Sequence, residues 1–546
     1  MPYTDRFARS RRLAVLLTVA AAFAGAGATT ASASTTQVSM FEAGGQLTTD
    51  PVDTLAALRV MGVSDIRLFM EWQNIAPSPA SRTMPHFQAT NPAAYPAAGW
   101  AQFDTVIRDA AQVGIGINLD VAGRAPLWAM PKSASTTGQG SLMPNASLFQ
   151  AFVQAVGTRY SGHYTPTGST TPLPPVAFWS VWNEPNYVAQ LFPQTTGKSK
   201  LPNSPHMYRN LVDAAWKGLG AAGHGHDKVI IGELAPRGYP HTQYGGMFPV
   251  TFVQSLYCLG SNYRPLTGST ASAEGCPTNA AGSRKFRSQH PGLFNSYGFA
   301  DHPYMRWYAP NSEQYYTCKT GLCTSLADYG NLTSALDHSL RAYGSGKKYS
   351  IWSTEYGYQT SPPKPYYNKK DKAYEVRVAT AAMYLNWAEY LSYKNPRIAS
   401  YDQYLLYDPP STAANNFDPY ASGLLYANGS PKPGYFAFRT PLYLPKTSAS
   451  HGSSLEVWGG VRAAPFASLD VGGARQTVEI QFAPSRSSTF TTLSTVTIAN
   501  REGYFDTHVV FPASGTVRLQ YTYPATDMLL APGLTADSRD VSVTIH

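Results

Sequence analysis

The chain has 546 residues, which exceeds one ordinary domain and predicts a large barrel or two domains. Charged residues make up only 14% of the sequence and aromatic residues 13%, with 36 tyrosines, a composition better suited to stacking on neutral sugars than to gripping phosphates. The formal charge of +9 falls to +6 when the first 33 residues, with four arginines and one aspartate, are set aside, because 38 basic and 32 acidic side chains remain. No dense Lys/Arg-rich run is present, so we expect no nucleic-acid partner.

The N-terminus has the pattern of a signal peptide. Arginines precede an apolar stretch at 13–28, and Ala31-Ser32-Ala33 suits cleavage before Ser34. A membrane anchor is the alternative, but this stretch is shorter than the roughly 20 residues that a spanning helix needs. We therefore assign residues 1–33 to a signal peptide and expect a secreted, extracellular protein with no membrane span.

From residue 38 onward, short apolar strands alternate with amphipathic helices, as a βα repeat requires. Strands are predicted at 38–43, 65–70, 116–121, 228–233, 296–300 and 398–406, and two more end at Glu184 and Glu355. Helices are predicted at 52–60, 100–113, 148–160, 207–219, 332–343 and 374–390. Eight such strands predict an α/β fold, a (β/α)8 TIM barrel at 34–445, whose reactive groups collect at the C-terminal ends of the strands.

A long segment rich in Gly, Ser and Tyr, 236–295, interrupts the repeat after the fifth strand. It contains Cys258 and Cys276, while Cys318 and Cys323 follow the sixth strand. Because no CxxC or neighbouring His spacing favours a metal, we expect disulfides and an oxidising compartment. Pairing of neighbours in sequence closes two small loops, although four cysteines allow three connectivities.

From about residue 445 the helical period disappears, and alternating strands with Gly, Pro and Ser turns follow. Strands are predicted at 455–461, 477–482, 495–499, 505–511, 516–523 and 541–545. The pattern predicts a separate, smaller all-β sandwich at 446–546. This sandwich is either a carbohydrate-binding module or a structural support for the barrel, and support is the simpler interpretation.

Two of the predicted strands end on a glutamate behind an apolar, aromatic run. The run VAFWSVWNEP delivers Glu184 directly after Asn183, and the run YSIWSTE ends at Glu355. A glycosidase needs one carboxylic acid and one carboxylate flanking the sugar, because its transition state resembles an oxocarbenium ion. Asn-Glu-Pro also suits a helix start, but two strand-end glutamates, on the fourth and seventh strands, favour catalysis.

These motifs resemble those of the retaining glycoside hydrolases of clan A, especially families 39 and 5. The likeness lies in Trp182-Asn183-Glu184-Pro185 with Thr354-Glu355 and covers roughly residues 37–445. Further pieces agree with it: Arg67 at the end of the second strand, Pro126 and Trp128 after the third, Asp301-His302-Pro303-Tyr304 after the sixth, and Gly423-Leu-Leu with Pro431-Lys-Pro433 near the end. The C-terminal region is similar to immunoglobulin-like modules of secreted bacterial proteins. The resemblance implies an enzyme that hydrolyses O-glycosidic bonds with net retention of anomeric configuration.

The resemblance also implies roles for individual residues. Glu184 would be the general acid and then the base, Glu355 the nucleophile, and Asn183 would bond the sugar 2-hydroxyl. Retention requires the two carboxyl groups to lie about 5 to 5.5 Å apart. It also requires a protonated Glu184 and an ionised Glu355.

Other residues are predicted to support this pair. Arg67 and Tyr304 would keep Glu355 ionised, and His302 would orient Glu184 or contact substrate. Trp128, in a strand-to-helix loop, is the best candidate for stacking on a sugar, although tryptophans are more often part of the core.

One position departs from the pattern of the clan. Its members usually end the eighth strand on a tryptophan that forms a sugar floor, whereas this chain has Gln403 and Tyr404 there. We expect Tyr404 to replace the tryptophan. A polar Gln403 at the site would suit an unusual glycone, such as a pentofuranose or a branched sugar.

The substrate class is an oligosaccharide, polysaccharide or glycoside. Loops after the fifth and sixth strands are predicted to wall the cleft, which favours a pocket and exo-action, with an open groove and endo-action as the alternative. A transglycosylase would use the same residues, and a noncatalytic glycan-binding protein is the alternative from another class. Hydrolysis by two carboxylates needs no cofactor or metal, and we expect a monomer.

Overall fold

The computed structural model describes residues 34, 36–134, 141–196, 200–239, 245–313, 321–363, 375–410, 420–525 and 532–546. The predicted signal peptide therefore lies outside the described residues. Within those ranges, no helix is at once long enough and apolar enough to span a membrane.

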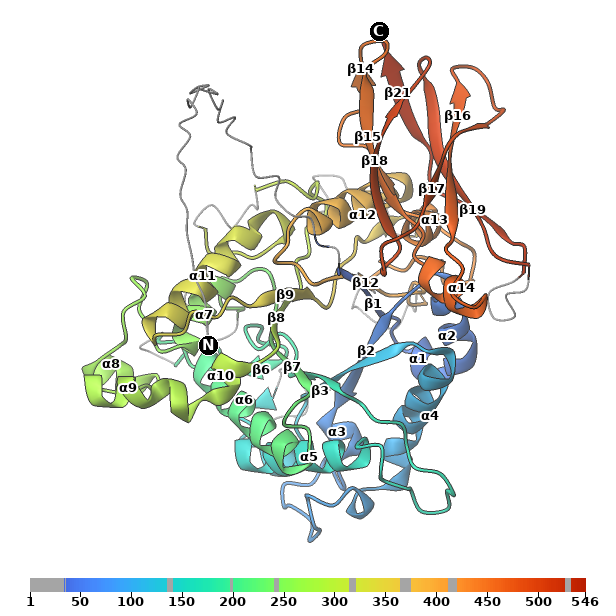
Figure 1. The fold of residues 1–546 in the computed structure, drawn as a ribbon. Helices are drawn as coiled ribbons and strands as arrows, with labels where there is room; N and C mark the ends of the chain where they lie inside the picture. The colour runs from blue at the N-terminus through green and yellow to red at the C-terminus, as the bar shows by residue number, and fades with distance from the viewer. Residues whose placement is uncertain are drawn as a thin grey trace, which may run out of the picture.

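The larger part of the protein is built on a sheet of eight parallel strands with helices between them (Figure 1). The strands are β1 (Val38–Glu42), β2 (Asp65–Glu71), β3 (Gly116–Ala122), β5 (Phe178–Val181), β7 (Lys228–Leu234), β8 (Gly298–Asp301), β9 (Ser350–Ser353) and β12 (Ser400–Tyr404). They pair in chain order, and β12 also pairs with β1. A parallel bridge between Ile351 and Ile398 brings the last two strands together. The predicted TIM barrel is confirmed, with β5 as the fourth strand and β9 as the seventh.

Helices pack outside these strands, and the buried face between the two layers is the main core. The six predicted helices are present as α2 (Pro51–Val60), α4 (Ala97–Val113), α5 (Ala146–Arg159), α6 (Ser204–Ala221), α11 (Tyr329–Ala342) and α12 (Val378–Tyr393). Short elements complete the barrel: α1 (Gln46–Thr49), α3 (Trp72–Ile75), α13 (Pro433–Arg439), η1 (Pro92–Ala94), η2 (Leu127–Ala129), η3 (Leu326–Asp328), β4 (Ser141–Leu142), β6 (Leu191–Phe192), β10 (Thr360–Ser361) and β11 (Val376–Arg377).

The interruption predicted at 236–295 is more ordered than its composition indicates. It contains α7 (Pro249–Leu256), α8 (Gly268–Ala273), α9 (Ala280–Gln289) and α10 (Pro291–Asn295). The Gly/Ser-rich helices α8 and α9 have low intrinsic propensity, so tertiary contacts stabilise them. One is the disulfide between Cys258 and Cys276, two cysteines that are neighbours in sequence. The sequence predicts disulfides but leaves their pairing open. Cys323 is also disulfide-bonded, and Cys318 lies outside the described residues.

Side chains alternate along the barrel strands between the helix-facing side and the barrel interior. The lower interior is an apolar layer of Met40, Phe178, Ile230, Ala300 and Trp352. Above this layer, toward the C-terminal ends of the strands, the interior becomes polar and charged. The chemistry of the protein is therefore confined to one end of the barrel, as the fold predicts.

The C-terminal part is a two-sheet β structure, as predicted. One sheet contains β13 (Leu442–Tyr443), β15 (Ser454–Gly460) and β18 (Tyr504–Val510). The other contains β14 (Ser448–Ala449), β16 (Thr477–Pro484), β17 (Thr491–Thr497), β19 (Gly515–Thr522), β20 (Thr535–Asp537) and β21 (Val541–Ile545). Two details differ from the prediction: β13 already pairs with β15 before residue 446, and a helix, α14 (Ala464–Asp470), follows β15.

The β structure packs closely against the barrel beside α2 and α12 (Figure 1). The guanidinium of Arg462 forms a buried ion pair with Glu389 of α12, and Arg462 Nε donates to the carbonyl of Phe438 at 2.7 Å. The Tyr504 hydroxyl donates to the same Glu389 carboxylate at 2.7 Å. At the other end of the interface, Arg59 of α2 pairs with Asp470 at 2.9 Å. These contacts favour the structural interpretation of the β structure.

We expect the Arg462–Glu389 pair to control how firmly the two parts are joined. Arg462→Met leaves a buried carboxylate without its cation and should destabilise the protein by about 3–5 kcal/mol in urea unfolding. The double variant Arg462→Met/Glu389→Leu removes both charges and should recover most of that loss. A single variant as stable as the wild type would contradict this role.

Candidate active site

The backbone turns sharply where β5 ends, and this turn aims Glu184 into the barrel mouth. Trp182 and Glu184 both have positive φ angles, 65° and 37°, which are uncommon for side-chain-bearing residues. The turn is held because the buried Trp182 ring lies over Gly123, where a Cβ would come within 2.3 Å of the ring. The Glu184 N–H also donates to the Glu233 carbonyl at 2.9 Å. Asn-Glu-Pro is therefore a strand-end bend rather than a helix start.

Glu355 lies just beyond β9, where two neighbours hold its carboxylate. Arg67 Nη1 lies 2.6 Å from Glu355 Oε1, and the Tyr304 hydroxyl donates to Oε2 at 3.0 Å. Both are the contacts expected from the sequence. The guanidinium and the phenol thus hold one oxygen each of the Glu355 carboxylate in place.

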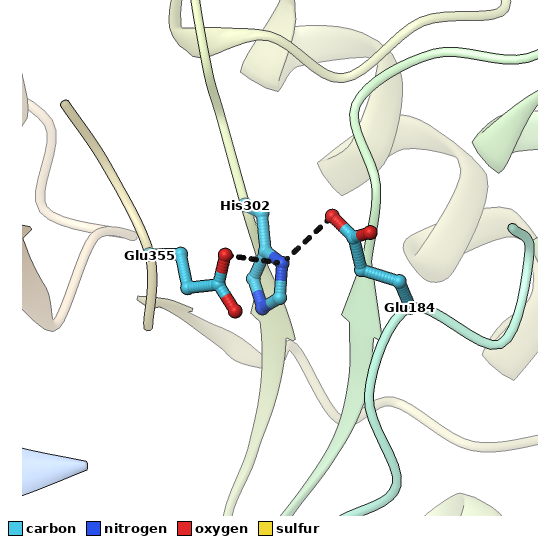
Figure 2. Close-up of side chains that lie close together, drawn as sticks. All are labelled: Glu184, His302 and Glu355. Atoms are coloured by element: carbon cyan, nitrogen blue, oxygen red, sulfur yellow. Dashed lines mark hydrogen bonds and ion pairs between the residues drawn. The ribbon is translucent and has the colours of Figure 1, made fainter. Parts of the chain in front are cut away.

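Glu184 and Glu355 meet at His302, which follows β8 (Figure 2). His302 Nδ1 lies 3.1 Å from Glu184 Oε1 and 3.5 Å from Glu355 Oε2. One polar atom from each of the three residues lies within 4.8 Å of the others. The two carboxylates are thus brought together from strands four and seven, with space for a reacting centre beside them.

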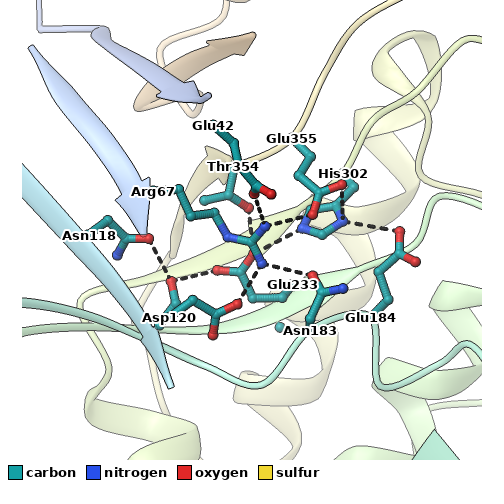
Figure 3. A network of polar contacts seen from close by, with 12 residues as sticks. Glu42, Arg67, Asn118, Asp120, Asn183, Glu184, Glu233, His302, Thr354 and Glu355 are labelled. Atoms are coloured by element: carbon teal, nitrogen blue, oxygen red, sulfur yellow. Dashed lines mark hydrogen bonds and ion pairs between the residues drawn. The ribbon is translucent and has the colours of Figure 1, made fainter. Parts of the chain in front are cut away.

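Arg67 of β2 connects most of the charged groups at this end of the barrel (Figure 3). Its Nη1 also contacts Glu42 Oε2 at 2.5 Å. Its Nη2 contacts Asp120 Oδ2 at 2.6 Å and Asn183 Oδ1 at 2.8 Å. Because Arg67 takes the oxygen of the Asn183 amide, the Asn183 nitrogen is turned away from Arg67 and available as a donor.

Glu233, at the end of β7, is a site residue that the sequence analysis missed. Its fully buried carboxylate accepts from Ser180 and Thr354, both at 2.6 Å, and from His302 Nε2 at 3.0 Å. Burial acts to raise the pKa of Glu233, but the charge of Arg67 and the bonds from His302 and Ser180 outweigh it and lower the pKa to about 2. Glu233 is therefore a permanent anion beneath His302.

Each ring nitrogen of His302 faces a carboxyl group, Nδ1 toward Glu184 and Glu355 and Nε2 toward Glu233. Burial acts to lower the pKa of His302, but Glu355, Glu184 and Glu233 together raise it well above its ordinary value. An imidazolium donates from both nitrogens, which matches these contacts. Glu184, His302 and Glu355 have the spacing of a metal site, and a cation bound there would displace the proton from His302 Nδ1.

Above this network lies a cavity of about 500 Å³. The residues that line it come from the end of β12 and from the loops after β5, β7, β8, β9 and β12: Glu184, Tyr187, Ala235, Pro236, Arg237, Gly238, Tyr239, Gly246, Tyr304, Arg306, Glu355, Gln359, Tyr404 and Tyr420. The loops after the fifth and sixth strands thus contribute walls, as expected. The Cys258–Cys276 disulfide lies farther along the chain, after α7, and is not part of the lining.

Trp128 and Gln403 were predicted to contact the substrate, but neither side chain lines the cavity. Trp128 lies in the core, only 8% exposed, with its ring edge-on to Trp72 and its Nε1 donating to the Pro77 carbonyl at 3.0 Å. Gln403 is fully buried and donates to the carbonyls of Tyr404 and Ser422 instead of facing the cavity. The prediction of an unusual glycone from Gln403 therefore loses its basis.

The alternation of side chains explains the error at Gln403. In β12, Asp402 and Tyr404 face the barrel interior, so Gln403 between them faces outward. Tyr404 does line the cavity, as expected. Glu42 and Glu233 could have been found by a different rule, because both stand at the C-terminal ends of barrel strands. Alternation alone would have placed Glu233 outward, since Ile230 faces the interior, and an irregularity between Ile231 and Leu234 turns Glu233 inward.

Comparisons with known proteins match this chain only at the level of structure. No protein-family model matches the sequence, and no curated protein does. The chain is similar to a family 39 glycoside hydrolase from Bacteroides cellulosilyticus, with 16% identity, 88% of this chain and 82% of that chain covered, and a TM-score of 0.47. It is also similar to AbfB, a family 51 α-L-arabinofuranosidase from Bifidobacterium longum (12% identity, 88% and 95% covered, TM-score 0.43). A third similar structure is a glucosidase from Croceicoccus marinus (10% identity, 90% and 88% covered, TM-score 0.42). At these values the likenesses support no conclusion about activity, which rests on the side chains described above.

Glu42 should make the stability of the protein depend on pH. Burial raises the pKa of Glu42 from 4.5 to about 7 against the attraction of Arg67. A carboxyl with a raised pKa in the folded state contributes stability that is complete below pH 4.5 and lost as the pH rises through 7. Between pH 4.5 and pH 8 the free energy of unfolding, measured with urea, should therefore fall by up to about 3 kcal/mol more in the wild type than in Glu42→Gln. Parallel pH profiles for the two proteins would contradict this assignment.

Proposed function

We propose that this protein is a retaining glycoside hydrolase in which Glu355 is the nucleophile and Glu184 the acid and base. The observation that carries the proposal is that oxygens of the two carboxylates lie within 4.8 Å of each other at the mouth of a TIM barrel. This close approach favours retention, for which the carboxyl groups lie about 5–5.5 Å apart, over inversion, for which they lie about 6.5–9.5 Å apart to admit a water molecule.

In the first step, Glu355 attacks the anomeric carbon and forms an ester while the bond to the leaving oxygen breaks. Glu184 gives its proton to that oxygen. Glu184 Oε1 faces His302, which leaves Oε2 to carry the proton toward the cavity. The His302 imidazolium then stabilises the new Glu184 carboxylate, and Glu233 holds the imidazolium in place.

In the second step, the Glu184 carboxylate takes a proton from water, and the water oxygen attacks the anomeric carbon. The ester to Glu355 breaks, and the Glu355 carboxylate returns to its contacts with Arg67 and Tyr304. Two inversions at the same carbon give net retention.

We extend the proposal to exo-action on an oligosaccharide or glycoside. On the Glu355 side of the cavity, Tyr304 lies edge-on to Tyr404 and Tyr420, with ring centroids 6.3 and 5.5 Å away. These packed rings support a pocket that holds a terminal sugar.

The two glutamates should respond differently to the leaving group. On unactivated oligosaccharides both Glu184→Gln and Glu355→Gln should lose at least about 10²–10⁴-fold in kcat/KM. On a dinitrophenyl glycoside, which needs no protonation, Glu184→Gln should retain far more activity than Glu355→Gln. With Glu355→Gly, added azide should give a glycosyl azide of inverted configuration, because it attacks from the face that the carboxylate vacated.

A panel of aryl glycosides and end-labelled oligosaccharides measures these effects and also reports the glycone and the mode of action. Glu313→Gln, which changes an exposed glutamate outside the cavity, is the matched control. Wild type that turns over no member of the panel, while binding glycans as well as the variants do, would favour the noncatalytic glycan-binding protein.

We also propose that the protein is exported and that its mature form begins at Ser34. The disulfide between Cys258 and Cys276 supports an oxidising compartment. The full-length chain expressed in a secreting bacterial host should be recovered outside the cytoplasm with Ser34 as its N-terminal residue. Recovery with an intact N-terminus in the cytoplasm alone would contradict export.

A further inference from the structure

Two tyrosines stand exposed at the mouth of the cavity. Tyr187 is 42% exposed and Tyr239 is 55% exposed, although both belong to its lining. Among the residues that the structure describes, neither ring packs on another aromatic ring and neither hydroxyl is hydrogen-bonded. This contrasts with Tyr304, Tyr404 and Tyr420 on the other side of the cavity, whose rings pack together.

Both exposed rings are held by one small arrangement of backbone. The Tyr187 N–H donates to the Glu184 carbonyl at 2.8 Å. This bond closes a tight turn that joins Tyr187 to the predicted acid Glu184. The Tyr239 N–H donates to the Gly246 carbonyl at 2.6 Å. A Cβ on Gly246 would lie 3.4 Å from Cδ2 of Tyr187, which places the backbone of one loop against the ring of the other.

A buried amide fixes the two loops relative to each other. Asn186, which is fully buried, donates to the carbonyls of Ala235 and Met247 at 2.9 and 3.1 Å. Its own oxygen accepts from the Ala235 N–H at 2.9 Å, and its carbonyl accepts from the Met247 N–H at 2.7 Å. The described parts of the two loops are therefore held against each other, which lowers the cost of binding to them.

The position of the rings relative to the two carboxylates decides what they contact. Glu184 protonates the leaving oxygen, so the surface that continues from Glu184 away from Glu355 faces the leaving group. Tyr187 and Tyr239 come from the loops after β5 and β7, on the Glu184 side. Flat aromatic faces on rigid supports are suited to the apolar face of a sugar ring.

We propose that Tyr187 and Tyr239 form the binding site for the sugar that departs as the leaving group. The inference rests on the proposed glycosidase function and specifies its substrate, a glycan in which the terminal sugar is attached to another sugar. A small alcohol or a phenol without a sugar would leave this platform unused or poorly covered.

The same platform provides a second activity, transfer to a sugar acceptor. A sugar bound there after the first step stands where the second-step water would stand. Glu184 takes the proton from its hydroxyl, that oxygen attacks the anomeric carbon, and the ester to Glu355 breaks. A new glycosidic bond replaces the ester, and Glu355 is released as a carboxylate.

Two substrates with the same glycone separate the platform from the catalytic centre. A disaccharide places a sugar on the platform, whereas a glycosyl fluoride places only fluoride beside Glu184. Tyr187→Ala and Tyr239→Ala should each lower kcat/KM for the disaccharide by about 3- to 10-fold and leave that for the fluoride unchanged. A second measurement uses the glycosyl fluoride as donor and the leaving sugar of the disaccharide as acceptor. In both alanine variants the ratio of glycosyl transfer to hydrolysis should fall by a similar factor.

Tyr187→Phe keeps the ring and should behave as the wild type does. Tyr297→Ala is the matched control, because Tyr297 is 48% exposed but lies just before β8, at the opposite end of the barrel. If the alanine variants lost kcat/KM equally on both substrates, or on neither, the proposed platform would be wrong, whereas the proposed glycosidase function would still stand. A wild type that hydrolyses neither substrate would overturn the proposed function and the platform with it.

Discussion

The charged end of this barrel depends on a single buried guanidinium. Arg67 lies within 2.6 Å of carboxylates from three different strands or strand ends, Glu42, Asp120 and Glu355. A buried cation with this many partners fixes their positions, and removing it would leave several carboxylates in a low-dielectric interior. The aim of Glu355 and the orientation of Asn183 both follow from where Arg67 is held.

Arg67 alone does not balance the negative charge around it, and the second cation is His302. Against the effect of burial, Glu355, together with the hydrogen bonds to Glu184 and Glu233, raises the pKa of His302 well above its ordinary value. Negative charge that Arg67 and His302 do not balance is removed by protonation of carboxyl groups. Burial raises the pKa of Glu42 to about 7 and that of Asp402 well above its ordinary value. The site thus holds several carboxyl groups close together without holding all of them as anions.

Sequence patterns predicted the barrel well, because each strand and helix carries its own hydrophobic period. They were less informative where a residue's direction mattered. Trp128 and Gln403 occupy loop and strand-end positions that suit substrate contact, yet the ring of one packs into the core and the amide of the other faces outward. Counting the alternation along β12 from Tyr404 would have corrected the second, but nothing local distinguishes a buried loop tryptophan from an exposed one.

The resemblance to clan A implied Arg67, His302 and Tyr304 as neighbours of the two glutamates. The sequence by itself determined the fold class and the two strand-end glutamates. It could do so because a β/α repeat fixes which ends of the strands come together, and carboxylates at those ends must then be neighbours. Only the tertiary structure decided that Glu233 lies beneath His302, that Glu42 shares Arg67 with Glu355, and that Tyr187 and Tyr239 stand on one rim. These are relations between loops and strands far apart in the chain, and their distances are set by the packing of the whole barrel rather than by any local pattern.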